Sequence, residues 1–402
     1  MKPKLPNDVE LILSRLKARG YRADIVGGCV RDFILGKKPY DYDVTTSARP
    51  EEIKTVFSDL KTLDVGIKHG TVTVIVSGVP YEVTTYRIES EYLDHRHPSR
   101  VDFTDKLGDD LGRRDFTMNA IAYNPDGGFT DLYCGRNDIF NKTIRAVGDA
   151  EVRFFEDALR ILRAVRFASV LDFEIEEKTA AAALKMREHI SSVSGERIAV
   201  EWKKALGGIG AYSAIKNNES ILLSFLALDK IVLPPLDSFN EASPEMREIG
   251  MFFLSSDDPV RDFERSADRM KYDSARRKFA ASVLGLAAEN PTFADERAVQ
   301  HLMTEYGADA VGGVIELFVM LSRAEKGALN LYRKILEENK PYRISDIKIS
   351  GRELSEIGFR GADIGAELSK LLSLVIDGEL DNAASSLYLA AKKHFDSRGG
   401  KG

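Results

Sequence analysis

The residues typical of β-strands are concentrated in the first 150 positions of this sequence, and this division constrains the fold more than any other feature. Residues 24–30 and 71–86 are rich in valine, isoleucine and threonine, which favour strands. The second segment contains a turn near Gly78 and Pro80, so it predicts a hairpin. Before both segments, apolar residues at helical spacing over 8–19 predict a helix.

Helical patterns dominate the rest of the chain. Apolar residues recur every three or four positions in one segment after another, without a short repeat or a low-complexity linker. The first of these predicted helices cover 152–170, 177–189, 194–206 and 220–228. We therefore predict an α+β protein, with an N-terminal head of mixed sheet and helices followed by an all-α remainder.

Composition excludes several classes of protein. Of the 402 residues, 44% are hydrophobic and 30% charged, which is typical of globular chains and not of disordered ones. No apolar run approaches the roughly 20 residues of a membrane span, and no signal-peptide core follows the N-terminus, so we expect a cytoplasmic protein. Two distant cysteines and six scattered histidines argue against a disulfide framework and a zinc site. The net charge of −6 gives no general attraction to nucleic acid, although a local basic patch would.

The first chemical motif combines a glycine turn with an acidic pair. Gly27 and Gly28 follow a predicted strand, and paired glycines let a backbone approach a phosphate closely. Asp41 and Asp43 come soon after, and alternate residues of a strand face the same side, so their carboxylates would lie together. Like charges this close favour a cation between them, and Mg²⁺ suits two carboxylates and a phosphate. Glu82 would add a third carboxylate, but an exposed strand glutamate is the simpler interpretation.

Two further motifs carry charges that fit a nucleotide. Arg113 and Arg114 could clamp a triphosphate, and Asp115 and Asn119 could bond a ribose hydroxyl. Taken alone, this stretch fits the start of a charged helix equally well.

The third motif lies in the predicted helix 152–170. Its polar face carries Arg153, Glu156, Arg160 and Arg163, with Asp157 and Arg166 on the flanks. One interpretation is that these residues have no binding role and form an exposed helix face with a Glu156–Arg160 ion pair. The functional one is base recognition: Asp157 accepts from an exocyclic amine while Arg160 donates to the neighbouring ring nitrogen. Cytosine and adenine present that pattern, whereas guanine and uracil would leave polar groups unsatisfied.

These motifs together resemble one enzyme family. In chain order they are Gly27–Asp32, Asp41–Asp43, Arg113–Asn119 and Glu156–Arg160. The sequence is thereby similar to the class II tRNA nucleotidyltransferases (CCA-adding enzymes) and bacterial poly(A) polymerases. Residues 193–198 resemble the neck of this family and 349–365 its tail, and the likeness is weakest over about 210–340.

The resemblance implies an activity and a set of residues. It implies a polymerase β-like head, and the template-independent addition of C, C and A to the 3′ end of tRNA from CTP and ATP. Asp41 and Asp43 would be catalytic and bind Mg²⁺. The implied nucleotide-binding residues are Gly27, Gly28, Arg31, Arg114, Asp115, Asn119, Asp157, Arg160, Arg163 and Arg166.

It also implies a division of the chain. We expect a catalytic head at 1–148, a neck with the base-reading helix at 149–208, a helical body at 209–325 and a tRNA-binding tail at 326–402. The charged stretch 87–98 has few apolar anchors and predicts a mobile loop. In the family such a segment resembles the loop required to add the terminal A.

Several alternatives stay open on the sequence. The motifs do not separate a full CCA enzyme from an A-adding one. A poly(A) polymerase is less favoured because the chain has neither that branch's basic stretch nor its basic tail. A non-catalytic tRNA-binding protein would have no need of Asp41 and Asp43, and a small-molecule nucleotidyltransferase would have no need of the long helical remainder. The oligomeric state, a homodimer included, stays open as well.

Overall fold

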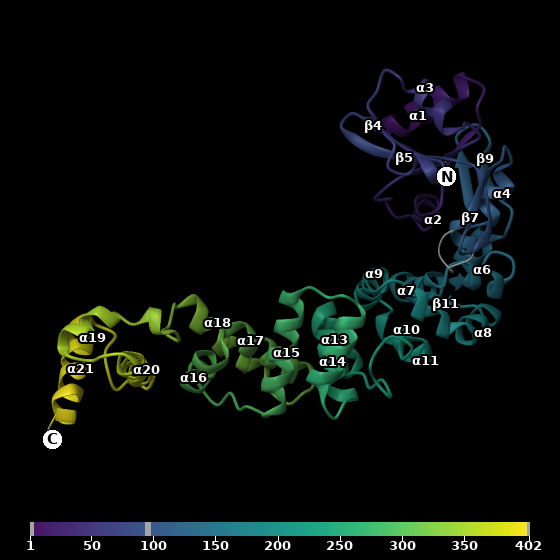
Figure 1. The fold of residues 1–402 in the computed structure, drawn as a ribbon. Coiled ribbons are helices and arrows are strands. Elements are labelled where there is room, and N and C mark those ends of the chain that lie inside the picture. Colours follow the sequence, from purple (N-terminus) through teal and green to yellow (C-terminus); the bar gives the residue numbers. More distant parts are fainter. Residues whose placement is uncertain (1–3, 93–97, 400–402) are drawn as a thin grey trace. The chain divides into compact units, whose positions relative to one another are not determined.

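The computed structural model describes residues 4–92 and 98–399, and it divides the chain into two compact units. The first comprises Met1–Leu226 with Arg269–Lys271, and the second comprises Ala227–Asp268 with Tyr272–Gly402. Strands occur in the N-terminal part of the chain and helices follow it (Figure 1). The predicted α+β class is confirmed. The finer division into head, neck, body and tail stays a prediction.

A seven-stranded mixed sheet organises the N-terminal part. Only β2 and β5 pair in parallel among its neighbours, and all the other neighbouring pairs are antiparallel. In spatial order the strands are β3 (Thr62–Leu63), β4 (Thr71–Val76), β5 (Val79–Thr85), β2 (Asp43–Thr46), β1 (Ala23–Val26), β8 (Ile121–Asn124) and β9 (Gly128–Asp131). Strand β1 lies inside the sheet, between β2 and β8, and is buried along its whole length. Interior position and burial make β1 the fixed support from which the next turn projects.

The predicted hairpin and N-terminal helix are confirmed. Strands β4 and β5 are joined at Ser77 and Gly78, whose φ angles of 51° and 82° are those of a tight primed turn. Helix α1 (Asn7–Ala18) buries Val9, Ile12 and Leu16. The remaining helices of this part are α2 (Gly28–Ile34), α3 (Pro50–Val56), η1 (Ile67–His69), α4 (Leu107–Gly112), η2 (Thr117–Asn119) and α5 (Gly135–Phe140).

The prediction of a mobile loop over 87–98 is wrong for the residues that the structure describes. Arg87–Tyr92 form β6 and Pro98–Phe103 form β7, and the two pair antiparallel. Residues 93–97 lie outside the described residues. The sequence has few apolar anchors here, but a strand pair is held by backbone hydrogen bonds, which the side-chain pattern does not reveal.

The single helix predicted over 152–170 is also wrong. The structure has two helices, α6 (Ala150–Glu156) and α7 (Leu159–Leu171). Between them Asp157 is extended, with φ −143° and ψ 103°, and its Oδ1 accepts a hydrogen bond from the Leu159 N–H at 3.0 Å. An aspartate that bonds to the backbone two residues on competes with the helix and starts a new one.

Helices make up the rest of the first unit apart from one small sheet. Two short strands, β10 (Thr143–Ile144) and β11 (Glu174–Ile175), pair in parallel. The helices are α8 (Glu177–Lys185), η3 (Arg187–Ser192), α9 (Gly195–Leu206), α10 (Ala211–Asn217) and α11 (Glu219–Leu222). The segments predicted at 177–189 and 220–228 therefore form shorter α-helices than expected.

A late segment of the chain completes this unit. Arg269 donates from Nη2 to the carbonyl oxygens of Ile190, Ser191 and Val193, each at 3.1 Å. Gly195 lies so close to it that an added Cβ would be 2.2 Å from the Arg269 carbonyl oxygen. The segment Arg269–Lys271 is thus fixed against the start of α9.

The second unit is helical throughout the part that the structure describes. It contains α12 (Leu236–Glu241), α13 (Pro244–Ser255), α14 (Pro259–Arg269, with its last residue in the first unit), α15 (Ser274–Ala288), α16 (Glu296–Tyr306), α17 (Ala308–Met320), α18 (Lys326–Glu337), η4 (Ile344–Asp346), α19 (Gly351–Ile357), α20 (Ala362–Ile376) and α21 (Ala384–Gly399). Leu354, Phe359, Leu371 and Leu387 form the core of its C-terminal part. No helix among the described residues is long and apolar enough to cross a membrane.

Candidate active site

Three of the predicted motifs meet at Gly27, in the turn between β1 and α2. Its φ of 81° lies in the left-handed region, which glycine adopts without strain. A Cβ at this position would lie 3.1 Å from Nη1 of Arg114 and 3.8 Å from Oδ2 of Asp43. The glycine turn, the acidic pair and the double-arginine motif therefore form one site, in which a side chain at Gly27 would be strained by its φ and would displace Arg114.

The acidic pair lies at the start of β2. Asp43 is its first residue and Asp41 precedes it by two, and both side chains are exposed at the mouth of the site. Partial desolvation by the protein beneath it and the charge of Asp41 raise the pKa of Asp43 to about 6, although Arg114 opposes the shift. Excess negative charge is what a divalent cation would relieve. Among the described residues no group of three or more metal-ligating side chains occurs. Glu82, on the neighbouring strand β5, nevertheless acts on the acidic pair, because its charge also raises the pKa of Asp43.

Asp110, which the sequence analysis did not select, holds both arginines. Its Oδ1 accepts from Nε and Nη2 of Arg113 at 3.0 and 2.7 Å. Its Oδ2 accepts from Nη2 of Arg114 at 3.2 Å and from Oγ1 of Thr45 at 3.1 Å. The spacing of three and four residues between the aspartate and the arginines was the available signal.

A relay of polar side chains joins α2, η2 and α7. Arg31 donates from Nη1 to Oδ1 of Asn119 at 2.9 Å, and Asn119 donates from Nδ2 to Oδ1 of Asp115 at 3.1 Å. Arg163 then donates from Nε to Oδ2 of Asp115 at 2.8 Å. Burial opposes ionisation of Asp115, but Arg163 and its other partners outweigh burial and lower its pKa to about 2. Four predicted nucleotide-binding residues therefore lie together.

Three arginines surround one buried ring on α7. The guanidinium carbons of Arg31, Arg163 and Arg166 lie 5.2, 5.4 and 3.9 Å from the centroid of Phe167. Nε of Arg166 also forms an ion pair at 2.6 Å with Oε2 of Glu201 on α9, a residue the sequence analysis missed. Burial is the main cause that lowers the pKa of Arg166 to about 10. The three arginines are balanced by the carboxylates of Asp32, Asp115 and Glu201, so their positions are fixed by ion pairs.

The predicted base-reading pair lies at the break between α6 and α7. Arg160 donates to Oε2 of Glu156 at 2.6 Å and to the carbonyl oxygens of Arg153 and Arg113 at 3.1 and 2.9 Å. Oδ2 of Asp157 accepts from Nη2 of Arg197 at 2.9 Å. The bond to the Arg113 carbonyl places Arg160 directly against the double-arginine motif.

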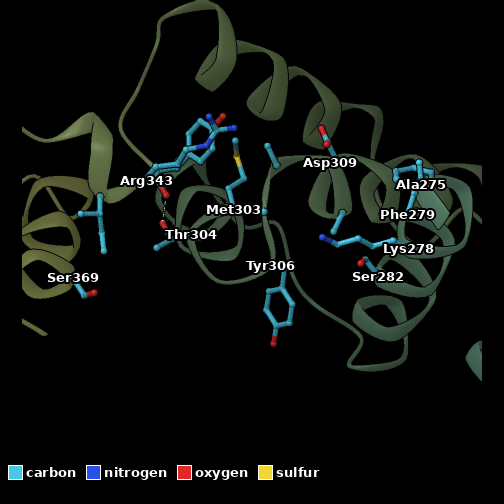
Figure 2. A pocket seen from close by; sticks show the side chains of 15 residues that line it. Ala275, Lys278, Phe279, Ser282, Met303, Thr304, Tyr306, Asp309, Arg343 and Ser369 are labelled. Carbon is cyan, nitrogen blue, oxygen red and sulfur yellow. Dashed lines mark hydrogen bonds between the residues drawn. The ribbon is translucent and has the colours of Figure 1, made fainter. Parts of the chain in front are cut away.

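The second unit has a pocket of its own, of about 720 Å³ (Figure 2). Its lining includes Lys278, Tyr306, Asp309 and Arg343, and Lys278 points into it. It contains none of the residues predicted to bind a nucleotide or a metal. The predicted site residues all lie in the first unit.

Comparison with known proteins agrees with this arrangement. The family model of the poly(A) polymerase head domain matches residues 23–145, and that of a probable RNA- and SrmB-binding site of polymerase A matches 172–217. The chain is 34% identical to a CCA-adding enzyme of Streptococcus thermophilus, with 94% of each chain covered. The chain belongs to the family of CCA-adding enzymes. A relative of that name from Lactococcus lactis is 35% identical over 97% of this chain and 98% of its own.

Other CCA-adding enzymes match over part of their length, or in fold. The enzyme of Enterococcus faecalis is 43% identical over 258 residues, and this chain spans only 59% of it in that alignment. The crystal structure of the Bacillus stearothermophilus CCA-adding enzyme, in complex with CTP, superposes with a TM-score of 0.81 at 30% identity and full coverage of both chains. A Thermotoga maritima CCA-adding enzyme complexed with tRNA shares the fold, with a TM-score of 0.66 at 21% identity.

The depressed pKa of Asp115 predicts a measurable pH dependence of stability. A pKa of about 2 against the usual 3.8 corresponds to about 2–3 kcal/mol, present above pH 4 and lost as the pH falls through 2. We expect the free energy of unfolding of Asp115→Asn to fall below that of the wild type at pH 7, and the difference to shrink below pH 4. Urea denaturation followed by Trp202, the single tryptophan and a residue of the first unit, measures it.

Asp126→Asn is the control, because the Asp126 carboxylate forms an exposed ion pair with Lys17. Its effect should stay below about 0.5 kcal/mol at every pH. A pH-independent difference for Asp115→Asn would contradict the assignment.

Proposed function

We propose that this protein adds C, C and A to the 3′ end of tRNA without a template, using CTP and ATP and releasing pyrophosphate. The observation that carries the proposal is the meeting of Arg114 and Asp43 at Gly27 in a member of the CCA-adding family. The relatives and solved structures named above support the same substrates, since they include CCA-adding enzymes bound to CTP and to tRNA.

In this proposal Asp41 and Asp43 hold Mg²⁺. Two adjacent exposed carboxylates, one with a raised pKa, fit an ion that takes one or two protein carboxylates and completes its shell with water and phosphate. Mg²⁺ would neutralise charge on the triphosphate. We also propose that Gly27, Gly28, Arg31 and Arg114 hold the triphosphate while the 3′-hydroxyl of tRNA attacks the α-phosphorus and pyrophosphate leaves. Such catalysis consists mostly of positioning and charge neutralisation.

The base would be selected by Asp157 and Arg160. Both have hydrogen-bonding capacity left over from their contacts within the protein. Arg160 uses Nη1 for two bonds and Nη2 for one, so Nε–H and one Nη2 hydrogen remain. Each oxygen of Asp157 accepts one bond and keeps a second lone pair. Glu156 and Arg197 would then orient the two side chains against the base rather than occupy them.

The proposal also covers the division of the chain into domains and the cellular compartment of the protein. We propose that the catalytic head occupies 1–148, the neck 149–208, the body 209–325 and the tRNA-binding tail 326–402, and that the protein works in the cytoplasm. An A-adding enzyme would use the same residues, so the products must separate the two activities.

The test uses three tRNA transcripts that end before CCA, after C and after CC. Each is incubated with purified protein, Mg²⁺ and CTP, ATP or both, and the products are sized to one nucleotide. We expect all three transcripts to grow to a discrete CCA end. Extension of the CC-ended transcript alone would show an A-adding enzyme, and a long A ladder a poly(A) polymerase.

Asp43→Asn should abolish nucleotide incorporation and leave tRNA binding intact, because it removes one carboxylate of the proposed metal pair. Incorporation in the assay above and binding by fluorescence anisotropy measure the two effects. Asp126→Asn, a surface aspartate outside the site, should change neither. Incorporation by Asp43→Asn at the wild-type rate would overturn the metal assignment.

Asp157→Ala should relax base selection without abolishing catalysis, because the acidic pair stays intact. We expect the preference for CTP over UTP, as a ratio of kcat/KM values, to fall by about one to two orders of magnitude. Glu151→Ala serves as the control, because Glu151 also lies on α6 and its carboxylate forms an exposed ion pair with Lys185. Unchanged discrimination in Asp157→Ala would mean that Asp157 only shapes the break between the helices.

A further inference from the structure

Asp110 is a buried charge that no substrate contact explains. It lies on α4 and is 0% exposed, yet it accepts hydrogen bonds from four donor atoms of three residues. Burial opposes its ionisation, but the charges of Arg113 and Arg114 outweigh burial and lower its pKa. The group is therefore a carboxylate whose charge is held by two arginines.

The same carboxylate joins the two sides of the candidate site. On one side Thr45, two residues after Asp43 on β2, donates to Oδ2. On the other side Arg114 donates to the same oxygen. Asp110 thus fixes the distance between the strand that carries the acidic pair and the arginine that faces it.

The bond to Asp110 also sets the orientation of Arg114. It uses Nη2, which leaves Nη1 beside Gly27, 3.1 Å from the position of an added Cβ. Nε is buried and has no hydrogen-bond partner among the described residues. The Arg114 guanidinium is therefore held by a hydrogen bond from Nη2 to Asp110, and its other N–H groups remain as donors for a ligand.

Charge balance indicates what that ligand is. One buried carboxylate faces two guanidinium groups, so the cluster of Asp110, Arg113 and Arg114 has a net charge of +1. A partly buried positive charge is favourable beside a negative one. Asp43 already lies on the same side of Arg114, and a phosphate group of an incoming nucleotide would add a second negative partner for its free donors.

We infer that Asp110 is a positioning residue for the incoming nucleoside triphosphate, acting by holding the Arg114 guanidinium beside Gly27 and Asp43. The inference rests on the function proposed above and deepens it. Asp110 itself touches no substrate. This role differs from a general contribution to folding, because Asp110 acts through Arg114 and affects the nucleotide but not the tRNA.

The test compares substrate dependence in Asp110→Asn, which keeps the shape and removes the charge. We expect KM for CTP and for ATP to rise about tenfold, as for loss of one charged hydrogen-bond partner. KM for tRNA should change less than about twofold, since the nucleotide site alone is altered. Pyrophosphate should inhibit correspondingly less well, because it competes for the same arginine.

A double-mutant cycle separates positioning from structure. If Asp110 acts through Arg114, Asp110→Asn should raise KM for CTP far less in an Arg114→Gln background than in the wild type. If Asp110→Asn raises KM for CTP by the same factor in both backgrounds, the inference is overturned. So would a rise in KM for tRNA equal to that for CTP.

Asp24→Asn is the matched control, because Asp24 is also a fully buried carboxylate bonded to an arginine and a hydroxyl, those of Arg22 and Tyr86. It should lower the melting temperature and leave KM for CTP unchanged. If Asp110→Asn does not fold, Thr45→Val is the variant to measure. It removes the hydrogen bond from Thr45 to Asp110 but keeps the charge of the carboxylate. A rise of about two- to threefold in KM for CTP alone supports the inference, and no rise overturns it.

Failure of this inference is distinguishable from failure of the proposed function. A wild-type protein that extends none of the tRNA transcripts refutes the function. A wild-type protein that extends them, with Asp110→Asn equal to it in KM for CTP, refutes only the role of Asp110.

Discussion

The candidate site depends on Gly27, a position whose backbone conformation and close neighbours disfavour a side chain. Gly27 follows β1 with a left-handed φ, and Arg114 and Asp43 both lie beside the position that a Cβ of this residue would occupy. The charge of Arg114 acts on Asp43 across this turn, and the missing side chain and the buried strand before it set where the two groups lie. The sheet order, with β2 and β8 on either side of β1, holds that strand in place.

Polar contacts connect the residues beside the sheet to the helices that follow. The relay from Arg31 through Asn119 and Asp115 to Arg163 joins α2, η2 and α7, and Arg163 and Arg166 both face Glu201 on α9. Each buried charge in it has a partner of opposite sign, without which desolvation would be costly. The residues proposed to bind the nucleotide are therefore held in place by contacts within the protein itself.

The sequence predicted the parts of this structure that depend on local patterns. The β4–β5 hairpin and helix α1 follow from spacing and composition. The meeting of Arg114 with the glycine turn and the acidic pair was implied by the family resemblance. The break at Asp157 was missed because one side-chain bond to the Leu159 N–H outweighs an otherwise helical pattern. Strands β6 and β7 were missed because their pairing uses backbone groups, and Asp110 because its importance comes from the tertiary contact with Thr45.

Because the segment Arg269–Lys271 belongs to the first unit, that unit can be completed only after much of the following chain has been synthesised. The carbonyl groups that end η3 receive their hydrogen bonds from Arg269, which lies 43 positions beyond Leu226, the end of the unit's main segment (269 − 226). During synthesis on the ribosome, the catalytic unit cannot complete its contacts until the first helices of the second unit have left the exit tunnel. A chain that stops at Leu226 would retain every candidate site residue and still lack the last piece that fixes the start of α9.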